Sequence, residues 1–218
     1  MAKVVTIVDY GIGNIFSVTR AIEHFGVSVL LTDRASDIAS AKTLVLPGVG
    51  AFSNGMQGLR DRSLVDPLRA YARGGRPLLG ICLGMQMLFT KSTEFGEHEG
   101  LDIIEGTIEP VAIPQDVAGR DMKIPHIGWS ELHVPDGRAA WKNSILGEVA
   151  PGENCYFVHS FTAVPAHPES RLADTFYGKS LISAAVQKNN VYGCQFHPEK
   201  SGSAGLKIIK SFLEISFA

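Results

Sequence analysis

Cys82 has neighbours that suit a catalytic nucleophile. The segment Gly80-Ile81-Cys82-Leu83-Gly84 follows an apolar run and precedes residues at helical spacing, a pattern typical of a nucleophile on a sharp strand-to-helix turn. Such a turn places Cys82 at a helix N-terminus, where the dipole favours the thiolate, and leaves the Leu83 N–H free to stabilise an oxyanion. An isolated cysteine more often serves packing alone, but the flanking glycines favour a nucleophile.

A histidine and a carboxylate stand close together near the end of the chain. Pro198 separates His197 from Glu199 at the end of a strand-like run, and residues two apart in an extended chain point the same way. Glu199 could therefore orient the imidazole of His197, and with Cys82 the three could perform nucleophilic acyl transfer. Taken alone, the pair would equally fit two solvated residues at the end of a strand.

The other cysteines and histidines lack such surroundings. Cys155 and Cys194 alternate within strand patterns, so we expect both in the core. No Cys-x-x-Cys, His-x-x-x-His or His-Glu-x-x-His spacing suggests a metal site, and we expect neither a metal nor an organic cofactor. No comparable partner is expected for the other six histidines, which are His24, His98, His126, His133, His159 and His167.

The first half of the chain alternates strand-like and helix-like segments. Val4–Val8 is apolar and β-branched, as a strand covered on both faces should be. Asn14 can cap a following helix that Gly26 ends. This rhythm predicts an α/β fold with a mainly parallel or mixed sheet flanked by helices. The predicted strands cover residues 4–8, 27–31, 43–46 and 78–81, and the predicted helices cover 15–25, 64–73 and 83–89.

The second half is richer in strands. Asn189-Asn190 tolerates the positive φ of a tight hairpin turn between two of them. The tail forms an amphipathic helix around Leu206, Ile209 and Phe212. The predicted strands in this half cover residues 101–111, 131–134, 156–164, 181–187 and 191–196.

The composition is that of an ordinary globular protein. The chain has 218 residues, 45% of them hydrophobic and 19% charged, with a formal net charge of −2. We expect a single domain over 1–218, with no attraction to nucleic acid or to an anionic membrane. The three widely spaced cysteines fit a reducing compartment, and the N-terminus lacks signal-peptide features, which predicts a cytoplasmic protein.

Two motifs together resemble those of the class I, triad-type glutamine amidotransferases. They are Gly80-Ile81-Cys82-Leu83-Gly84-Met85-Gln86 and His197-Pro198-Glu199, in the order of that family, and the resemblance covers essentially the whole chain. It implies a flavodoxin-like α/β fold and a glutaminase. In that reaction Cys82 attacks the side-chain amide of glutamine, His197 protonates the leaving ammonia and later activates water, and Glu199 holds His197.

The resemblance also implies roles for residues around the triad. Backbone N–H groups of Leu83 and Val49 would form the oxyanion hole, the latter after rearrangement of Pro47–Gly50. The positions that match those binding the amino-acid end of glutamine are Gly50, Gln86, Ser160 and Phe161. Gly50 could instead only shape a turn, and Phe161 could be a core residue.

Further segments narrow the match within the family. Asp9-Tyr10-Gly11-Ile12-Gly13-Asn14, Pro125-His126-Ile127-Gly128-Trp129 and Tyr156-Phe157-Val158-His159-Ser160 are similar to those of a glutaminase subunit whose ammonia passes to a separate (β/α)8-barrel cyclase. This chain is too short to include such a barrel, which takes about 250 residues. The resemblance places Asn14, Trp129, Tyr156 and Lys200 near that partner, although Lys200 could be a solvated charge.

Three other interpretations remain open at this stage. The chain could be a class I glutaminase that serves anthranilate, guanylate or carbamoyl phosphate synthesis. It could be a non-catalytic binding module that keeps the fold, although Cys82, His197 and Glu199 are all present. It could also be a cysteine hydrolase with an unrelated substrate.

Overall fold

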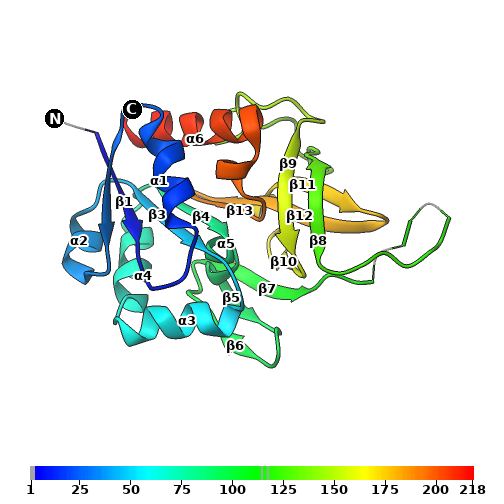
Figure 1. Cartoon of the computed structure of the whole chain (residues 1–218), viewed down its shortest axis with the longest axis horizontal. Helices are drawn as coiled ribbons and strands as arrows, with labels where there is room; N and C mark the ends of the chain where they lie inside the picture. Colours follow the sequence, from blue (N-terminus) through cyan, green and yellow to red (C-terminus); the bar gives the residue numbers. More distant parts are fainter. Residues whose placement is uncertain (1–2, 114, 117) are drawn as a thin grey trace.

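A computed structural model describes residues 3–113, 115–116 and 118–218. Helices and strands alternate in the first half, and strands dominate the second half (Figure 1). In chain order the elements are β1 (Val4–Val8), α1 (Ile15–Glu23), β2 (Ser28–Thr32), α2 (Ala35–Ser40), β3 (Leu44–Gly48), α3 (Phe52–Asp61), α4 (Val65–Arg73), β4 (Leu78–Cys82), α5 (Leu83–Met87), β5 (Phe89–Ser92), β6 (His98–Glu99), β7 (Ile104–Pro110), β8 (His126–Glu131), β9 (Asn154–His159), β10 (Phe161–Pro165), the 3-10 turn η1 (Pro168–Ser170), β11 (Arg171–Tyr177), β12 (Ser180–Lys188), β13 (Val191–Cys194), the 3-10 turn η2 (Pro198–Lys200) and α6 (Gly202–Ser216).

The central sheet is mixed. Among the described residues its strand order is β11-β12-β13-β4-β3-β1-β2. The strands from β13 to β2 run parallel, and β12 and β11 add an antiparallel edge. The predicted mainly parallel or mixed sheet flanked by helices is confirmed. Because β3, β4 and β13 run parallel, their carboxyl ends meet at one edge, where ligands bind in open α/β sheets.

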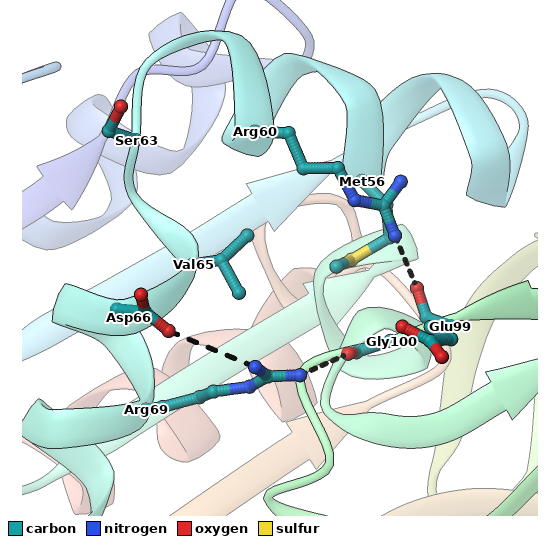
Figure 2. Close-up of a pocket in the computed structure, with 8 residues that line it drawn as sticks. All are labelled: Met56, Arg60, Ser63, Val65, Asp66, Arg69, Glu99 and Gly100. Atoms are coloured by element: carbon teal, nitrogen blue, oxygen red, sulfur yellow. Dashed lines mark hydrogen bonds and ion pairs between the residues drawn. The ribbon is translucent and has the colours of Figure 1, made fainter.

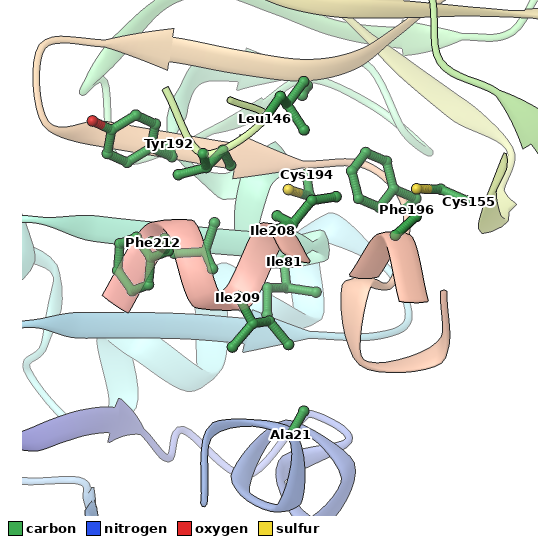
Figure 3. Close-up of a cluster of buried hydrophobic side chains, with 14 of the residues drawn as sticks. Ala21, Ile81, Leu146, Cys155, Tyr192, Cys194, Phe196, Ile208, Ile209 and Phe212 are labelled. Carbon is green, nitrogen blue, oxygen red and sulfur yellow. The ribbon is translucent and has the colours of Figure 1, made fainter. Parts of the chain in front are cut away.

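Side chains on the two faces of this sheet enter two separate apolar clusters. Val5, Ile7 and Ile81 point to the face covered by α1 and α6, whereas Val8 and Leu78 point to the face covered by α2, α3 and α4. Figure 3 shows the first cluster, where Cys155 and Cys194 lie among Ile208, Phe196 and their neighbours. Both cysteines are fully buried and free, so the expectation that they are core residues is confirmed.

Two smaller sheets lie beside the carboxyl edge of the central sheet. In the described part of the chain, one has the order β10-β7-β5-β6 and the other pairs β8 with β9. β9 and β10 are separated by Ser160 alone and belong to different sheets. The predicted strand over 156–164 is therefore wrong in its continuity, because the chain changes sheets at Ser160.

Other predicted boundaries also differ from the structure. The helix expected over 83–89 ends at Met87, because Phe89 pairs with Ile104 in a sheet. The strand expected over 101–111 begins only at Ile104. The strand expected over 131–134 lies mostly outside β8, and His133 forms only an isolated bridge with Asp174. Long-range pairing decided each of these segments, and short apolar runs do not reveal it.

Two further local predictions concern Asn14 and Asn189. Asn14 does occupy the N-cap of α1, but its side chain makes no capping hydrogen bond, so the capping prediction is wrong in its mechanism. Asn189 has the expected positive φ of 54° between β12 and β13. Helices α2 and α3 and strands β6 and β11 lie in segments for which no element was predicted, as do most residues of β5 and β8.

No helix in the described ranges is both long enough and apolar enough to cross a bilayer.

Candidate active site

Cys82 sits on a sharp turn between β4 and α5. Its backbone has φ 53° and ψ −110°, a conformation that residues with a side chain rarely adopt. Such strain persists only where the surrounding structure enforces it, and it is typical of functional sites. The thiol lies at the first turn of α5, as the sequence predicts for a nucleophile.

Two glycines make this turn sterically feasible. A Cβ on Gly84 would stand 1.8 Å from the carbonyl oxygen of Leu46 in β3. A Cβ on Gly80 would stand 2.8 Å from the backbone of Gly84 itself. The two glycines that flank Cys82 are therefore required by packing, because α5 lies directly on the backbone of β3 and β4.

His197 and Glu199 form a buried pair. His197 Nδ1 lies 2.8 Å from Glu199 Oε1, and their side chains are 2% and 1% exposed. The spacing of His197 and Glu199 predicts an extended chain here. Glu199 belongs instead to the 3-10 turn η2. The turn is held by the Lys200 N–H, which donates to the carbonyl of His197 at 3.0 Å, and by the Ser201 hydroxyl, which donates to it at 2.7 Å.

The surroundings of His197 favour its protonated form. Burial disfavours the imidazolium, but Cys82 and Glu199 together outweigh burial and raise the pKa of His197 to about 9. His197 Nε2 is buried without a hydrogen-bond partner among the described residues. An imidazole with one nitrogen fixed by a carboxylate and the other free toward a thiol can deliver a proton to a leaving group.

One cavity brings together most of the residues predicted for catalysis and substrate binding. It has a volume of about 260 Å³ and is lined by Cys82 and His197 at the carboxyl edge of the central sheet. Glu199 lies behind His197 and does not line it. The cavity is also lined by Val49, Leu83, Gly50, Gln86, Ser160 and Phe161.

Gln86 ties the wall of this cavity to the thiol. Its side-chain amide donates to Gln195 Oε1 at 3.0 Å and to the Phe161 carbonyl at 3.4 Å. The amide of Gln195 in turn lies 3.8 Å from Cys82 Sγ. Gln86 therefore lines the cavity and also holds Gln195, whose amide lies beside the Cys82 thiol. Gln195 had no signal in the sequence beyond lying two residues before His197.

Glu94 is a cavity residue that the sequence did not indicate. It lies on the loop after β5 and lines the same cavity as Cys82. Its Oε2 accepts the N–H of Phe52 at 2.5 Å, which fixes the carboxylate at the start of α3. No motif surrounds Glu94, and only the packing of the β5–β6 hairpin beside α3 brings it to the site.

The loop after β3 borders the same cavity as the Cys82 thiol. Val49 and Gly50 line the cavity, and Gly50 has φ 93°. The buried hydroxyl of Tyr10 donates to the carbonyl of Pro47 at 2.7 Å and anchors the start of this loop. The assignment of the Val49 N–H to an oxyanion hole stays a prediction.

Three of the four residues predicted at a partner interface lie close together. Trp129 and Tyr156 face each other across the β8–β9 pair, with ring centroids 5.9 Å apart, and Trp129 is 56% exposed. Lys200 ends η2, whose next residue, Ser201, accepts the backbone N–H of Tyr156 at 3.0 Å. Asn14 is the N-cap of α1, which packs against η2.

Several histidines have partners that the sequence did not predict. His126 and His159 are buried and lie within hydrogen-bonding distance of each other, at 3.0 Å. His167 pairs with Glu105 at 2.8 Å on the surface. The expectation that the other six histidines lack comparable partners is therefore wrong for these three. The pairs His126–His159 and His167–Glu105 join residues 33 and 62 positions apart, whereas the further contacts of these rings, with Ser130, Phe161 and Glu169, are local in sequence.

A second cavity has neither a cysteine nor a histidine in its described lining. Figure 2 shows this cavity, of about 310 Å³, between α3, α4 and β6. Arg60 donates there to the carbonyl of Glu99 at 3.0 Å, and Arg69 donates to that of Gly100 at 3.1 Å. These guanidinium groups therefore join secondary-structure elements to one another. Within the described ranges, no three histidine, cysteine, aspartate or glutamate side chains cluster as metal ligands.

Comparison with known proteins agrees with this geometry. The family model described as glutamine amidotransferase class-I matches residues 6–215. The imidazole glycerol phosphate synthase subunit HisH 1 of Legionella pneumophila (strain Paris) is 53% identical over 212 residues, covering 97% of this chain and 99% of that protein. The subunit HisH of Syntrophotalea carbinolica is 44% identical over 210 residues, covering 95% and 98%.

A solved structure shares the fold at low identity. It is described as the crystal structure of glutamine amidotransferase, and it aligns with a TM-score of 0.71 and 19% identity over 98% of this chain and 99% of the other. The family model covers nearly the whole chain, and the relatives match it from end to end. The chain belongs to the class I glutamine amidotransferase family.

Proposed function

We propose that residues 1–218 act as one cytoplasmic glutaminase domain, which hydrolyses glutamine and passes the ammonia to a separate cyclase subunit. That cyclase would be the (β/α)8-barrel partner in imidazole glycerol phosphate synthase, which makes imidazole glycerol phosphate and aminoimidazole carboxamide ribotide in histidine biosynthesis. The observation that carries the proposal is the arrangement of Cys82 on a strained turn, in one cavity with His197, which Glu199 holds from behind. The 53% identity to a protein named as a subunit of that synthase supports the choice of partner.

The proposed reaction proceeds through a thioester. The Cys82 thiolate attacks the side-chain carbonyl carbon of glutamine, and the carbonyl oxygen becomes an oxyanion held by the Leu83 N–H and, after loop rearrangement, the Val49 N–H. The imidazolium of His197 gives its proton to the amide nitrogen, the C–N bond breaks, and ammonia leaves. His197 then takes a proton from water, which attacks the thioester and releases glutamate and the thiolate.

Glu94 is proposed to recognise the α-ammonium group of glutamine. Among the described residues that line the cavity, it is the one with an acidic side chain. Because its Oε2 already accepts the Phe52 N–H, the side chain is fixed before substrate arrives. An ammonium bound to a fixed carboxylate forms a charge-assisted hydrogen bond, stronger than a neutral one.

Glu94→Gln is expected to raise the KM for glutamine roughly tenfold, with a smaller change in kcat, because a hydrogen bond to a charged group is worth about 1.5–3 kcal/mol. The amide side chain introduced at position 94 still has an oxygen that can accept the Phe52 N–H, so the loop should stay in place. Steady-state kinetics measure the effect. Glu97→Gln is the matched control, since Glu97 lies on the same hairpin and pairs with Lys91 at 2.7 Å on the surface. Equal KM values for the two variants would exclude Glu94 from substrate binding.

The partner is tested by measuring glutaminase activity with and without the candidate cyclase and imidazole glycerol phosphate. We expect the cyclase to raise the rate, because one missing oxyanion donor costs on the order of 3 kcal/mol in the barrier. Binding would then turn the Pro47–Gly50 loop into its active arrangement. An isolated subunit that already works at the rate of the complex would exclude this switch.

Trp129→Ala and Lys200→Ala are each expected to reduce the cyclase-dependent rise more than the basal rate. Trp129 offers an exposed aromatic surface, and Lys200 directly follows the residue that orients His197. Lys207→Ala is the control, because Lys207 lies on α6, pairs with Glu153 at 2.7 Å and is not among the residues of the proposed interface. A rise unchanged in both interface variants would place the partner on a different surface.

A further inference from the structure

A chain of hydrogen bonds runs beneath the strand pair β8–β9 to the wall of the cavity. Ser130 Oγ lies 2.9 Å from His126 Nε2, and His126 Nδ1 lies 3.0 Å from His159 Nε2. His159 Nδ1 lies 2.8 Å from the carbonyl oxygen of Phe161. Each imidazole therefore uses both ring nitrogens, although His126 and His159 are only 1% and 6% exposed.

Burial decides the charge of the two imidazoles in this chain of hydrogen bonds. Burial lowers the pKa of His126 to about 4. Burial also lowers the pKa of His159 to about 4, opposed by the Phe161 carbonyl and aided by His126 and His197. Both rings are therefore neutral near pH 7, and each carries one proton.

The Phe161 carbonyl can only accept, so His159 carries its proton on Nδ1 and accepts at Nε2. His126 must then donate from Nδ1 and accept the Ser130 hydroxyl proton at Nε2. Every donor along the chain points from Ser130 toward Phe161, and no other arrangement of the protons satisfies all three contacts.

Aromatic packing fixes the first imidazole. The ring of His126 stacks on Phe157, with centroids 5.1 Å apart and an interplanar angle of 15°. It also stacks on Tyr177, with centroids 4.2 Å apart and an interplanar angle of 19°. A ring stacked on two aromatic neighbours keeps its nitrogens in one plane, so residues of β9 and β11 set the direction of its two hydrogen bonds.

The two ends of the chain lie at functionally different places. Ser130 and Trp129 are adjacent on β8, whose side chains alternate between faces, with Trp129 exposed and Ser130 turned toward His126. At the other end, the Phe161 carbonyl also receives the Gln86 amide at 3.4 Å, and both Ser160 and Phe161 line the cavity.

We propose that His126 and His159 are positioning residues, which hold the Ser160–Phe161 backbone for glutamine and relay to it the position of β8. The inference rests on the proposed function, since it takes Trp129 as part of the cyclase contact. A shift of β8 on docking would move Ser130 and His126, and through His159 would reposition the carbonyl of Phe161. His159 lines the cavity, but among the described residues neither histidine hydrogen-bonds to Cys82 or His197, so both act by positioning the backbone.

Two variants of His126 separate the relay from packing. In His126→Asn the amide N–H stands near the former Nδ1 and can still donate to His159. In His126→Gln the amide reaches toward the former Nε2, which keeps a contact with Ser130 and loses the one with His159. Both replace the ring with a neutral amide, so both lose the stacking on Phe157 and Tyr177.

Glutamine KM and kcat are measured for each variant, alone and with the cyclase and imidazole glycerol phosphate. His126→Gln is expected to raise KM roughly three- to tenfold, the effect of one lost hydrogen bond, with a smaller change in kcat and a reduced stimulation by the cyclase. His126→Asn should stay closer to the wild type in both respects. Ser130→Ala, which leaves both imidazoles in place, is expected to reduce the stimulation as well.

Tyr177→Phe is the control for local packing, because it keeps the ring stacked on His126 and removes only the hydrogen bond to the Lys123 carbonyl at 2.8 Å. Thermal unfolding of each variant identifies any that fail to fold, in which case Ser130→Ala carries the test. Equal KM and stimulation in His126→Gln and His126→Asn would overturn the relay. A wild type that the cyclase does not stimulate would instead overturn the proposed partner, and the KM values of the isolated variants would still decide the positioning role.

Discussion

Cys82→Ala is expected to abolish glutamine hydrolysis, with a loss of roughly 10⁴-fold or more, since removing a nucleophile from a triad costs up to about 10⁶ in kcat. Alanine can keep the turn between β4 and α5, but it cannot form a thioester. Glutamate release by the complex measures the loss. The cyclase reaction driven by added ammonia should remain, because Cys82 has no role after ammonia is formed.

The other members of the proposed triad give graded controls. His197→Ala should be as severe as Cys82→Ala, since it removes the proton donor. Glu199→Gln should be milder, because an amide oxygen at the position of Oε1, 2.8 Å from His197 Nδ1, still accepts its hydrogen bond. Glutaminase activity near the parent level in Cys82→Ala would remove Cys82 from the mechanism.

Gly84→Ala is expected to destabilise the fold on the order of 3 kcal/mol, at the upper end of the usual cost of overpacking. In most helices this change stabilises by about 1 kcal/mol. Here the new Cβ would stand 1.8 Å from the Leu46 carbonyl oxygen, which is rigid backbone in the middle of the central sheet. The clash therefore outweighs the gain in propensity. Denaturant unfolding measures the free-energy difference.

Gly55→Ala is the matched control for that change. Gly55 also lies inside a helix, α3, but its new Cβ would meet the end of the Met87 side chain at 2.7 Å. A flexible thioether can move aside, so the loss should stay below about 1.5 kcal/mol. Similar losses for the two variants would mean that α5 does not press on β3 as closely as the structure indicates.

The site was predictable where its chemistry is local in sequence. Cys82 and its two glycines occupy one turn, and His197 and Glu199 are separated by a single residue, so their spacing indicates both the nucleophile and the base. The spacing predicts that an extended chain places the His197 and Glu199 side chains on one side, whereas in the structure a 3-10 turn brings them together. The alternation of apolar runs likewise predicts the parallel part of the sheet, because buried strands read as continuous apolar segments.

Only the tertiary structure decided which distant residues join this site. Glu94 comes from a segment without a motif, and the motif segments around His126 and His159 gave no sign that the two imidazoles pair; sheet pairings and a change of sheet at Ser160 bring these groups together. A sequence pattern reports the period and the local turn of a segment. It does not report which strands pair across long separations, because that choice depends on the combined burial of many side chains. The sequence by itself therefore determined which groups are proposed to react, and the tertiary structure decided what surrounds and positions them.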